Sequence, residues 1–509
     1  MPEEKQNEVA EQNSQVNNDT KKDIIDGIVE KTKQSRGDEG YDVTKKAVEY
    51  LLEKIINESQ EHEKMNQDEN EMINKETIDA MIAEIDQKLS LQMDEILHNE
   101  EFKKLESAWR SLKFLVDRTD FSENIKIEMF DCDKVDLAKD FAKDPDITLS
   151  GLYKLIYSSE YGTHGGEPYG AIIGNYEFGP GKDDIDLLRN VSKIAADSHA
   201  PFIASPSPAM FDIDSYNELP DLTDMEELFK QPKYTKWRRL REEDNSRYLC
   251  LALPRFLLRT PYGKDPYDED NINKVESFNY QETIAGEHEN YLWGNAAFAF
   301  ATRLTESFAK YRLCNNIIGV ESGGNVQDLP MTFYESLGNI IQKIPTEIEI
   351  TDKKELSLAG EGFISLAIEK GTDNATIFSA NSIKKPSQSK DSQKQTNSRL
   401  EIQLPYMFII NRIAHYIKVI QRRKLGSYTD KDAIQEGLMK WINRYKHPGI
   451  NPPPNVRCRK PLKDVSITVT DNEDDPGWYN VELKITPHYK YMGLYCELSL
   501  VGKLDIDNS

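Results

Sequence analysis

The residues whose types could do chemistry in this chain are eight histidines, five cysteines and a few glycine-rich turns. The histidines form neither an HExxH nor an HxH pattern, and none lies within a few residues of a cysteine; they include His164, His199, His415 and His488. No CxxC pair occurs among the cysteines, which are Cys132, Cys250, Cys314, Cys458 and Cys496. We therefore expect reduced thiols, no bound metal and no cofactor.

Two glycine-rich segments come close to nucleotide-binding or catalytic patterns. Gly174 and Gly179 have the separation found in a P-loop, but Pro180 stands where the lysine must be. In GVESGG the serine, Ser322, falls one position too late for a GxSxG nucleophile elbow. These departures from the motifs predict that the protein catalyses no reaction. The alternative is that it is an enzyme, a soluble α/β hydrolase with Ser322 or His164 in its active site.

The charge balance argues against two classes of partner. Lys and Arg number 64 and Asp and Glu 88, and the resulting net charge of −24 repels nucleic-acid phosphates and anionic membranes. No apolar run approaches the roughly 20 residues needed to span a bilayer, and the N-terminus lacks a signal-peptide pattern. We expect a cytoplasmic protein that neither binds nucleic acid nor inserts into a membrane. Three basic clusters, at 233–241, 418–424 and 457–463, are suited to orienting neighbours in an ordered assembly.

The first 124 residues divide into an arm and a helical segment. Residues 1–72 are polar and acidic, which predicts a flexible arm with short amphipathic helices. One of these helices carries apolar residues at helical spacing, namely Ile24, Ile25, Ile28 and Val29. Residues 73–124 carry a longer stripe, which includes Ile82, Ile85, Leu89, Met93, Leu105 and Trp109. Asn99 interrupts the stripe and indicates a bend, so we expect one or two long amphipathic helices, which need a partner surface from this chain or from another.

Residues 125–400 mix strand-like and helical patterns. Apolar runs at 169–174 and 248–254 predict strands and 295–311 predicts a helix, so the fold class is α/β or mixed α+β. The polar segment 381–398 has a single aliphatic residue, Ile383, and predicts a solvated loop before the C-terminal domain.

The C-terminal domain, residues 401–509, begins with helical patterns at 404–423 and 437–445. Alternating apolar residues then predict three strands of an antiparallel meander. The second and third strands carry Val481, Leu483, Ile485, Leu494, Leu498 and Leu500. Because a three-stranded sheet leaves unpaired backbone groups at its edges, we expect strand exchange with neighbouring copies.

Seven long motifs occur in order along the chain. The first two are LSLQMDEILHNEEFKKLESAWRSLKFLV at 89–116 and YGTHGGEPYGAIIGNYEF at 161–178. The others are HAPFIASPSP (199–208), RYLCLALPRFLLRTPYG (247–263), YLWGNAAFAFATRLTESFA (291–309), PTEIEITDKKE (345–355) and LPYMFIINRIAHYIK (404–418). Together they resemble the large sheath subunit of type VI secretion systems, the TssC/VipB family. The resemblance covers roughly residues 75–505, and no motif matches before it.

The resemblance implies a structural protein with a contractile-sheath fold that catalyses nothing. It implies an obligate heterodimer with a small sheath subunit, which polymerises into a helical tube around an inner Hcp-type tube and contracts to propel it for effector delivery. A baseplate and an AAA+ disassembly ATPase are further implied partners.

The same resemblance suggests which segments make these contacts. The 73–124 stripe would contact the small subunit, the C-terminal strands would exchange between protomers, and the helix around Ile24 and Ile28 would be recognised by the ATPase. A sheath protein of another phage-tail-like contractile machine is the closer alternative.

Overall fold

The computed structural model describes residues 45–46, 48, 50, 75–264, 272–273, 275, 278–284, 288–336, 339–387, 392–423, 431–449, 452–471, 479–488 and 498–503. The chain forms two compact units, one of Met1–Glu95 with Lys274–Glu282 and one of Ile96–Asn273 with Thr283–Ser509. The first unit holds most of helix α3 (Lys75–Leu97), and the second, larger unit holds the elements from α4 (Glu100–Asp117) onward.

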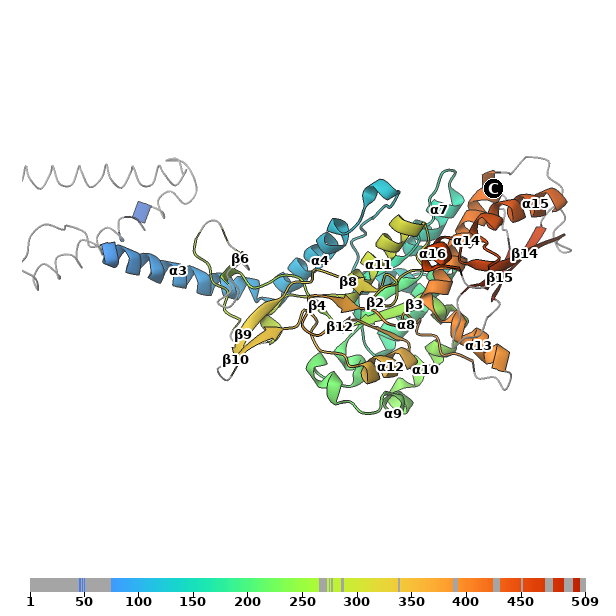
Figure 1. Ribbon diagram of the computed structural model, residues 1–509. Coiled ribbons are helices and arrows are strands. Elements are labelled where there is room, and N and C mark those ends of the chain that lie inside the picture. The colour runs from blue at the N-terminus through green and yellow to red at the C-terminus, as the bar shows by residue number, and fades with distance from the viewer. Residues whose placement is uncertain are drawn as a thin grey trace, which may run out of the picture. The chain divides into compact units, whose positions relative to one another are not determined.

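A four-stranded parallel sheet forms the centre of the large unit (Figure 1). Its order is β1 (Ile172–Phe178), β2 (Phe202–Pro206), β3 (Leu249–Leu253) and β11 (Phe363–Ser365). Every residue of β2, β3 and β11 is buried. Continuous apolar runs such as LCLAL therefore form strands here because helices cover both faces of a parallel sheet.

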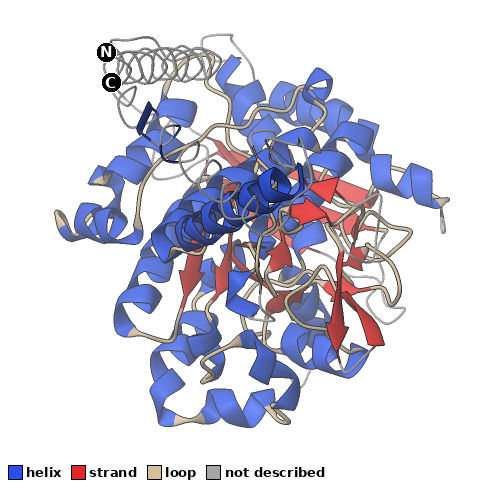
Figure 2. Ribbon diagram, turned by 90° about the vertical axis from the view of Figure 1, so that its left-hand side faces the viewer, coloured by secondary structure: helices blue, strands red, loops and turns tan. Residues whose placement is uncertain are grey.

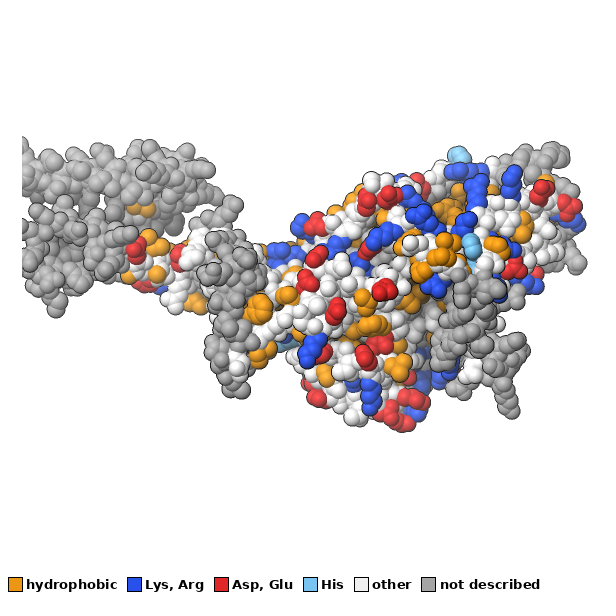
Figure 3. Space-filling view, in the orientation of Figure 1, with side chains coloured by type: hydrophobic (Ala, Val, Ile, Leu, Met, Phe, Trp, Pro, Cys, Tyr) orange, Lys and Arg blue, Asp and Glu red, His pale blue; other side chains and the backbone are white. Residues whose placement is uncertain are grey.

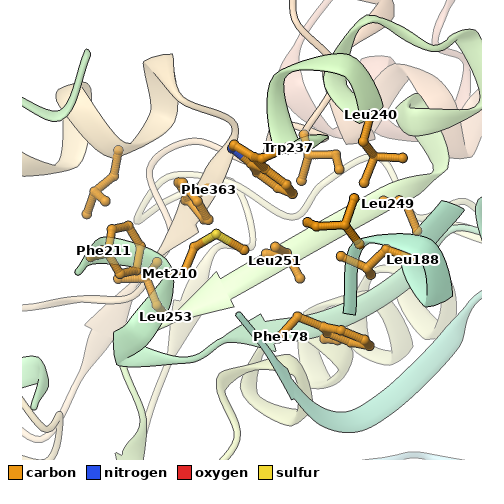
Figure 4. Packing of buried hydrophobic residues seen from close by; sticks show 14 of the residues in the cluster. Phe178, Leu188, Met210, Phe211, Trp237, Leu240, Leu249, Leu251, Leu253 and Phe363 are labelled. Atoms are coloured by element: carbon orange, nitrogen blue, oxygen red, sulfur yellow. The ribbon is translucent and has the colours of Figure 1, made fainter. Parts of the chain in front are cut away.

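The two faces of this sheet hold separate apolar cores. Leu249, Leu251 and Leu253 point to one face, where α8 (Lys182–Asp197) and α10 (Thr235–Glu242) pack (Figure 4). Cys250 and Ala252 point to the other face, against α11 (Ala296–Tyr311). The period-two alternation of β3 thus sends successive side chains into different cores, and helices lie around the strands in Figure 2.

The C-terminal part of the large unit has a third core. Helices α14 (Leu404–Arg423) and α15 (Lys431–Ile442) pack with an antiparallel sheet of order β14 (Leu462–Asp471), β15 (Tyr479–Pro487) and β16 (Leu498–Lys503). Val465, Ile467 and Val469 of β14 are buried, whereas the alternate residues Ser466 and Thr468 are exposed. One face of the sheet is therefore covered by helices and the other is polar.

The smaller elements connect these layers. The short helices are α5 (Lys134–Ala142), α6 (Gly151–Tyr153), α7 (Ser159–Gly162), α9 (Met225–Lys230), α12 (Asp352–Gly360), α13 (Ser392–Glu401) and α16 (Pro454–Arg459). The short strands are β4 (Phe256–Leu257), β5 (Gly263–Lys264), β6 (Ile272–Asn273), β7 (Trp293–Gly294), β8 (Asn325–Val326), β9 (Thr332–Ser336), β10 (Asn339–Lys343), β12 (Ala367–Ile368) and β13 (Ala375–Thr376).

The predicted α/β class is confirmed, since parallel and antiparallel sheets occur with long helices. The bend at Asn99 is also confirmed, because its side chain accepts hydrogen bonds from the amides of Glu101 and Phe102 and caps α4. The prediction of a solvated loop over 381–398 is wrong. Ile383 is fully buried and donates its amide hydrogen to the carbonyl oxygen of Leu249 (3.0 Å), and Ser392–Glu401 forms α13. One aliphatic residue is enough to anchor this segment, because Ile383 packs into the apolar core that the central sheet and its helices form.

Candidate assembly surfaces

The loop between β1 and α8 is where a parallel sheet of this kind could hold a phosphate group. Here the amide of Gly179 donates to Oδ2 of Asp184 (2.7 Å), and Lys134 Nζ pairs with Oδ1 of the same carboxylate (2.7 Å). Asp183 adds a second negative charge in the first turn of α8. The chain's own carboxylate therefore occupies the place of an anion, in agreement with the sequence-based argument against nucleotide binding.

The two residues of the hydrolase alternative do not form a catalytic pair. Ser322 and His164 are both exposed, and no hydrogen bond links Ser322 to any histidine within the described part of the chain. Ser322 borders a pocket whose lining also includes Tyr311, Phe378 and Cys458, but no histidine. A serine without a base has no means of becoming a nucleophile.

A closed ion-pair network fills the carboxyl end of β3, where open α/β sheets bind ligands. Arg255 donates two hydrogen bonds to the carboxylate of Glu347 (both 2.7 Å), and His288 Nε2 lies 3.0 Å from Glu347 Oε1. Burial by itself would raise the pKa of Glu347, but Arg255 and His288 hold it below its ordinary value. Burial raises the pKa of the neighbouring Glu177. The network satisfies its own charges, which suits a structural role.

Neither a metal site nor a membrane span is found in the residues described. No group of three or more His, Cys, Asp or Glu side chains in those ranges could hold a metal ion. No helix there is both long and apolar enough to cross a bilayer.

Helix α4 has one face fixed in the large unit and an opposite face that is apolar and exposed. On the inner face, Glu106 accepts a hydrogen bond from buried Arg259 (2.9 Å), Ser107 Oγ donates to the carbonyl of Trp293 (2.7 Å), and Phe114 packs on Phe256. The outer face carries Phe102, Leu105, Trp109 and Val116, of which Leu105 and Trp109 are each 57% exposed. An apolar stripe on a well-anchored helix marks an interaction surface. We name Phe102, Leu105, Trp109 and Val116 the α4 face.

Helix α3, in the other unit, also has exposed apolar residues. Ile82 is 51% exposed and Leu89 40%, while Ile85 and Met93 are half-buried. Its buried side includes Asp94, whose Oδ1 accepts a hydrogen bond from the hydroxyl of Tyr280 (2.6 Å). Of the six residues predicted to contact a small subunit, four are therefore exposed and two are half-buried.

The residues predicted for strand exchange lie in a sheet with β15 at its centre. Val481, Leu483 and Ile485 are buried in the third core, and Ile485 and Leu483 pair in register with Leu498 and Leu500 of β16. Leu494 lies outside the described residues. Within the described strands, β14 and β16 each pair with β15 alone, so each has an outer edge of the kind that another chain can extend.

Many cations of the basic clusters are engaged inside the chain. In the 233–241 cluster, Arg241 is buried and pairs with Glu361, and Arg238 donates to the carbonyls of Phe229 and Gln231. In contrast, Arg459 and Lys460 are exposed, and Lys and Arg side chains gather over α14 and α16 in Figure 3. Fewer Lys and Arg side chains are thus available on the surface for contacts with other molecules than the three sequence clusters indicate.

The remaining predicted residues are those of the N-terminal helix, and four exposed apolar residues were not predicted as contacts. Ile24, Ile25, Ile28 and Val29 lie outside the described residues. The sequence reasoning left Phe102 and Val116 out of the proposed contact, although both continue the helical spacing of Leu105 and Trp109. It also missed Met129 and Phe130, which are 64% and 57% exposed; the signal was the alternation of Ile125 and Ile127 with charged residues just before them.

Comparison with known proteins identifies the class to which this fold belongs. Residues 79–384 match the family model described as "EvpB/VC_A0108, tail sheath N-terminal domain". Residues 393–504 match the model described as "EvpB/VC_A0108, tail sheath gpW/gp25-like domain". The chain belongs to the VipB family of type VI secretion tail sheath proteins.

A curated relative covers most of the chain. It is the type VI secretion system sheath protein TssC1 of Pseudomonas aeruginosa, which is 40% identical over 433 residues, or 84% of this chain and 86% of the relative. The family and this relative are structural sheath proteins, and the resemblance drawn from the motifs is confirmed.

Proposed function

We propose that this chain is the large subunit of a type VI secretion contractile sheath and catalyses no reaction. It forms a heterodimer with a small sheath subunit, and the heterodimers polymerise in the cytoplasm into a helical tube around an inner Hcp-type tube. Contraction propels the inner tube, with a baseplate and an AAA+ disassembly ATPase as further partners. Membership in the tail sheath family and the 40% identity to the type VI secretion sheath protein TssC1 support this proposal.

The observation that carries the heterodimer is the α4 face. Leu105 and Trp109 are exposed on a helix whose opposite side is held by the Glu106–Arg259 ion pair. Burying an exposed Leu or Trp side chain stabilises a complex by about 1.5–3 kcal/mol each. The α4 face therefore offers enough apolar surface for a stable contact, and it lies in the stripe assigned to the small subunit.

The outer edges of β14 and β16 support linkage between protomers. Backbone pairing at such an edge adds many hydrogen bonds in register, so it forms a strong link that can persist while other contacts change. Wall contacts between domains would then be the ones exchanged during contraction.

The test is negative-stain electron microscopy of this chain, alone and co-expressed with the small sheath subunit. We expect hollow helical tubes only on co-expression. The double variant Leu105→Asp/Trp109→Asp should weaken binding of the small subunit by about 100-fold, since it removes roughly 3 kcal/mol of apolar burial. It should therefore give no tubes.

The matched control for this experiment is Leu105→Met/Trp109→Phe, which keeps the face apolar and should still form tubes. Monodisperse protein in both wild-type samples would contradict the proposed function. Tubes from the aspartate variant would contradict the role of the α4 face.

A further inference from the structure

The chain between α4 and α5 runs like a strand that has no neighbouring strand. Residues 125–133 contain no helix, turn or bend. Ile125 and Ile127 are half-buried, whereas Lys126 and Glu128 are exposed. Ile127 packs with Leu115 of α4 in a small apolar cluster. This alternation is that of a strand with one buried face, yet residues 124–132 make no backbone-to-backbone hydrogen bond within the described chain.

Side chains from the rest of the large unit hold both ends of this segment. At its start, Arg312 donates to both the backbone carbonyl and the carboxylate of Glu123. At its end, the hydroxyl of Tyr176 donates to the carbonyl of Cys132. Lys134 Nζ then donates to the carbonyl of Glu177 (2.6 Å) and pairs with Asp184 (2.7 Å). The segment is fixed before any partner arrives, which lowers the entropy lost when a second strand pairs with it.

The middle of the segment presents apolar side chains beside its unpaired backbone. Met129 is 64% exposed and Phe130 57% exposed. Exposed peptide groups in an extended segment, together with large apolar side chains, are what an added β-strand recognises. A helix or a lipid surface would cover the side chains but leave the backbone groups unused.

The apolar surface here is continuous with the α4 face. Leu112 lies between Trp109 and Val116 along α4, and it packs against the same cluster as Ile127. A partner that covers Trp109 therefore lies close to the segment.

The charge of this region favours a different chain over a second copy. Asp131 and Asp133 are exposed, and the whole chain carries a net charge of −24. Two copies of the segment paired side by side would bring carboxylates together, which destabilises a strand pair.

We propose that residues 125–131 pair with an extended segment of the small sheath subunit in an intermolecular β-ladder. Because consecutive side chains of a strand point to opposite faces, Met129 and Phe130 contact apolar side chains on the two different faces of the bound segment, while its backbone pairs with that of residues 125–131. This inference rests on the proposed heterodimer and states where the backbone of the small subunit binds.

Hydrogen–deuterium exchange of the full chain, free and in tubes formed with the small sheath subunit, is the first test. We expect the amides of 125–131 to exchange rapidly in the free chain and to slow by at least about 100-fold in the complex. If tubes form and these amides exchange as in the free chain, the ladder is refuted and the sheath function stands. If the two chains do not associate at all, both are refuted.

Proline substitution distinguishes backbone pairing from simple surface burial. Successive amides of a strand point to opposite edges, so only one of Glu128→Pro and Met129→Pro removes a hydrogen bond to the partner. That variant should bind the small subunit about 10-fold or more weakly than the alanine variant at the same position, and the other proline variant should match its alanine control. Equal effects of the two prolines, or none from either, would overturn the proposal. Circular dichroism of each free variant checks that it is folded.

Discussion

Individual charged residues in this protein serve the fold rather than a reaction. Glu347 is fully buried and accepts two hydrogen bonds from Arg255, and His288 lies on the same carboxylate. Asp184 occupies the anion position at the start of α8. In both places a charge that could have bound a ligand is neutralised by a neighbour in the same chain. These polar groups beside the central sheet therefore hold loops in place.

At the residue scale we predict that Glu347→Gln destabilises the large unit by about 3 kcal/mol. The change leaves Arg255 largely buried without its counter-charge, and that penalty exceeds the loss of an exposed ion pair. Urea unfolding followed by tryptophan fluorescence measures it. Lys230→Gln, which breaks an exposed pair with Glu226 and Glu227, is the control and should change stability by less than about 1 kcal/mol. If the two variants lost similar amounts of unfolding free energy, the Glu347 network would contribute no more to stability than an exposed ion pair.

The secondary-structure elements fall into two groups: some are covered by the rest of the chain, and others leave an apolar face or a strand edge exposed. The parallel sheet is covered on both faces, and its carboxyl end is closed by the Arg255–Glu347 pair. The α4 face, the 125–131 segment and the outer edges of β14 and β16 remain open in the single chain.

At the element scale we predict that Leu498→Pro prevents tube assembly while leaving the rest of the chain folded. Leu498 pairs with Ile485 at the start of β16, an edge strand of the single chain. Once another chain extends its outer edge, β16 becomes a central strand, and proline, which lacks a backbone donor, is not accommodated there. Electron microscopy of the co-expressed variant measures assembly. Leu498→Val keeps the backbone donor and should form tubes. Normal tubes from the proline variant would argue against a role for β16 in linking protomers.

At the scale of the whole molecule, the two family domains are joined by a buried seam along α14. His415 Nε2 lies 2.9 Å from the carbonyl of Ser198, Lys418 stacks over the ring of Tyr161, and Arg422 donates to the carbonyl of Gly162 (2.7 Å). The His199 ring packs against His415. The seam contains two histidines among cations, so its stability should depend on pH.

Burial, with a smaller contribution from the charge of Lys418, lowers the pKa of His199 and of His415 to about 3. Because these folded-state values lie below the ordinary histidine pKa of about 6.5, the stability they provide is complete above that pH and is lost as the pH falls. When the pH falls from about 7.5 to about 5.5, the two histidines together lower the free energy of unfolding by about 2–3 kcal/mol. The carboxylates of the unfolded chain stay ionised over this range.

The measurement for this prediction is the thermal midpoint at the two pH values. His199→Gln/His415→Gln should flatten the dependence, whereas His164→Gln, at an exposed position, should not change it. An unchanged slope in the double variant would show that other groups govern the acid response.

Local patterns in the sequence were enough to predict much of the architecture. The stripe from Ile82 to Trp109 predicted one or two long helices, and Asn99 marked the interruption because a capping side chain is a local signal. Alternation at Val481, Leu483 and Ile485 predicted a strand of the C-terminal sheet. The long motifs predicted the sheath family, which the comparisons confirmed.

Tertiary structure decided the features that depend on residues distant in sequence. Ile383 is buried because its segment pairs with β3, which no local pattern around it indicates. Glu347 meets Arg255 across 92 residues, and Asp184 meets Lys134 across a segment that includes α6, α7 and β1. Met129 and Phe130 are exposed on a segment whose ends are held by contacts to Arg312, Tyr176 and Glu177, all distant in sequence. Periodicity determines which face of an element is apolar, but only packing determines whether that face is covered, and the faces left uncovered are the ones this sheath protein can use for assembly.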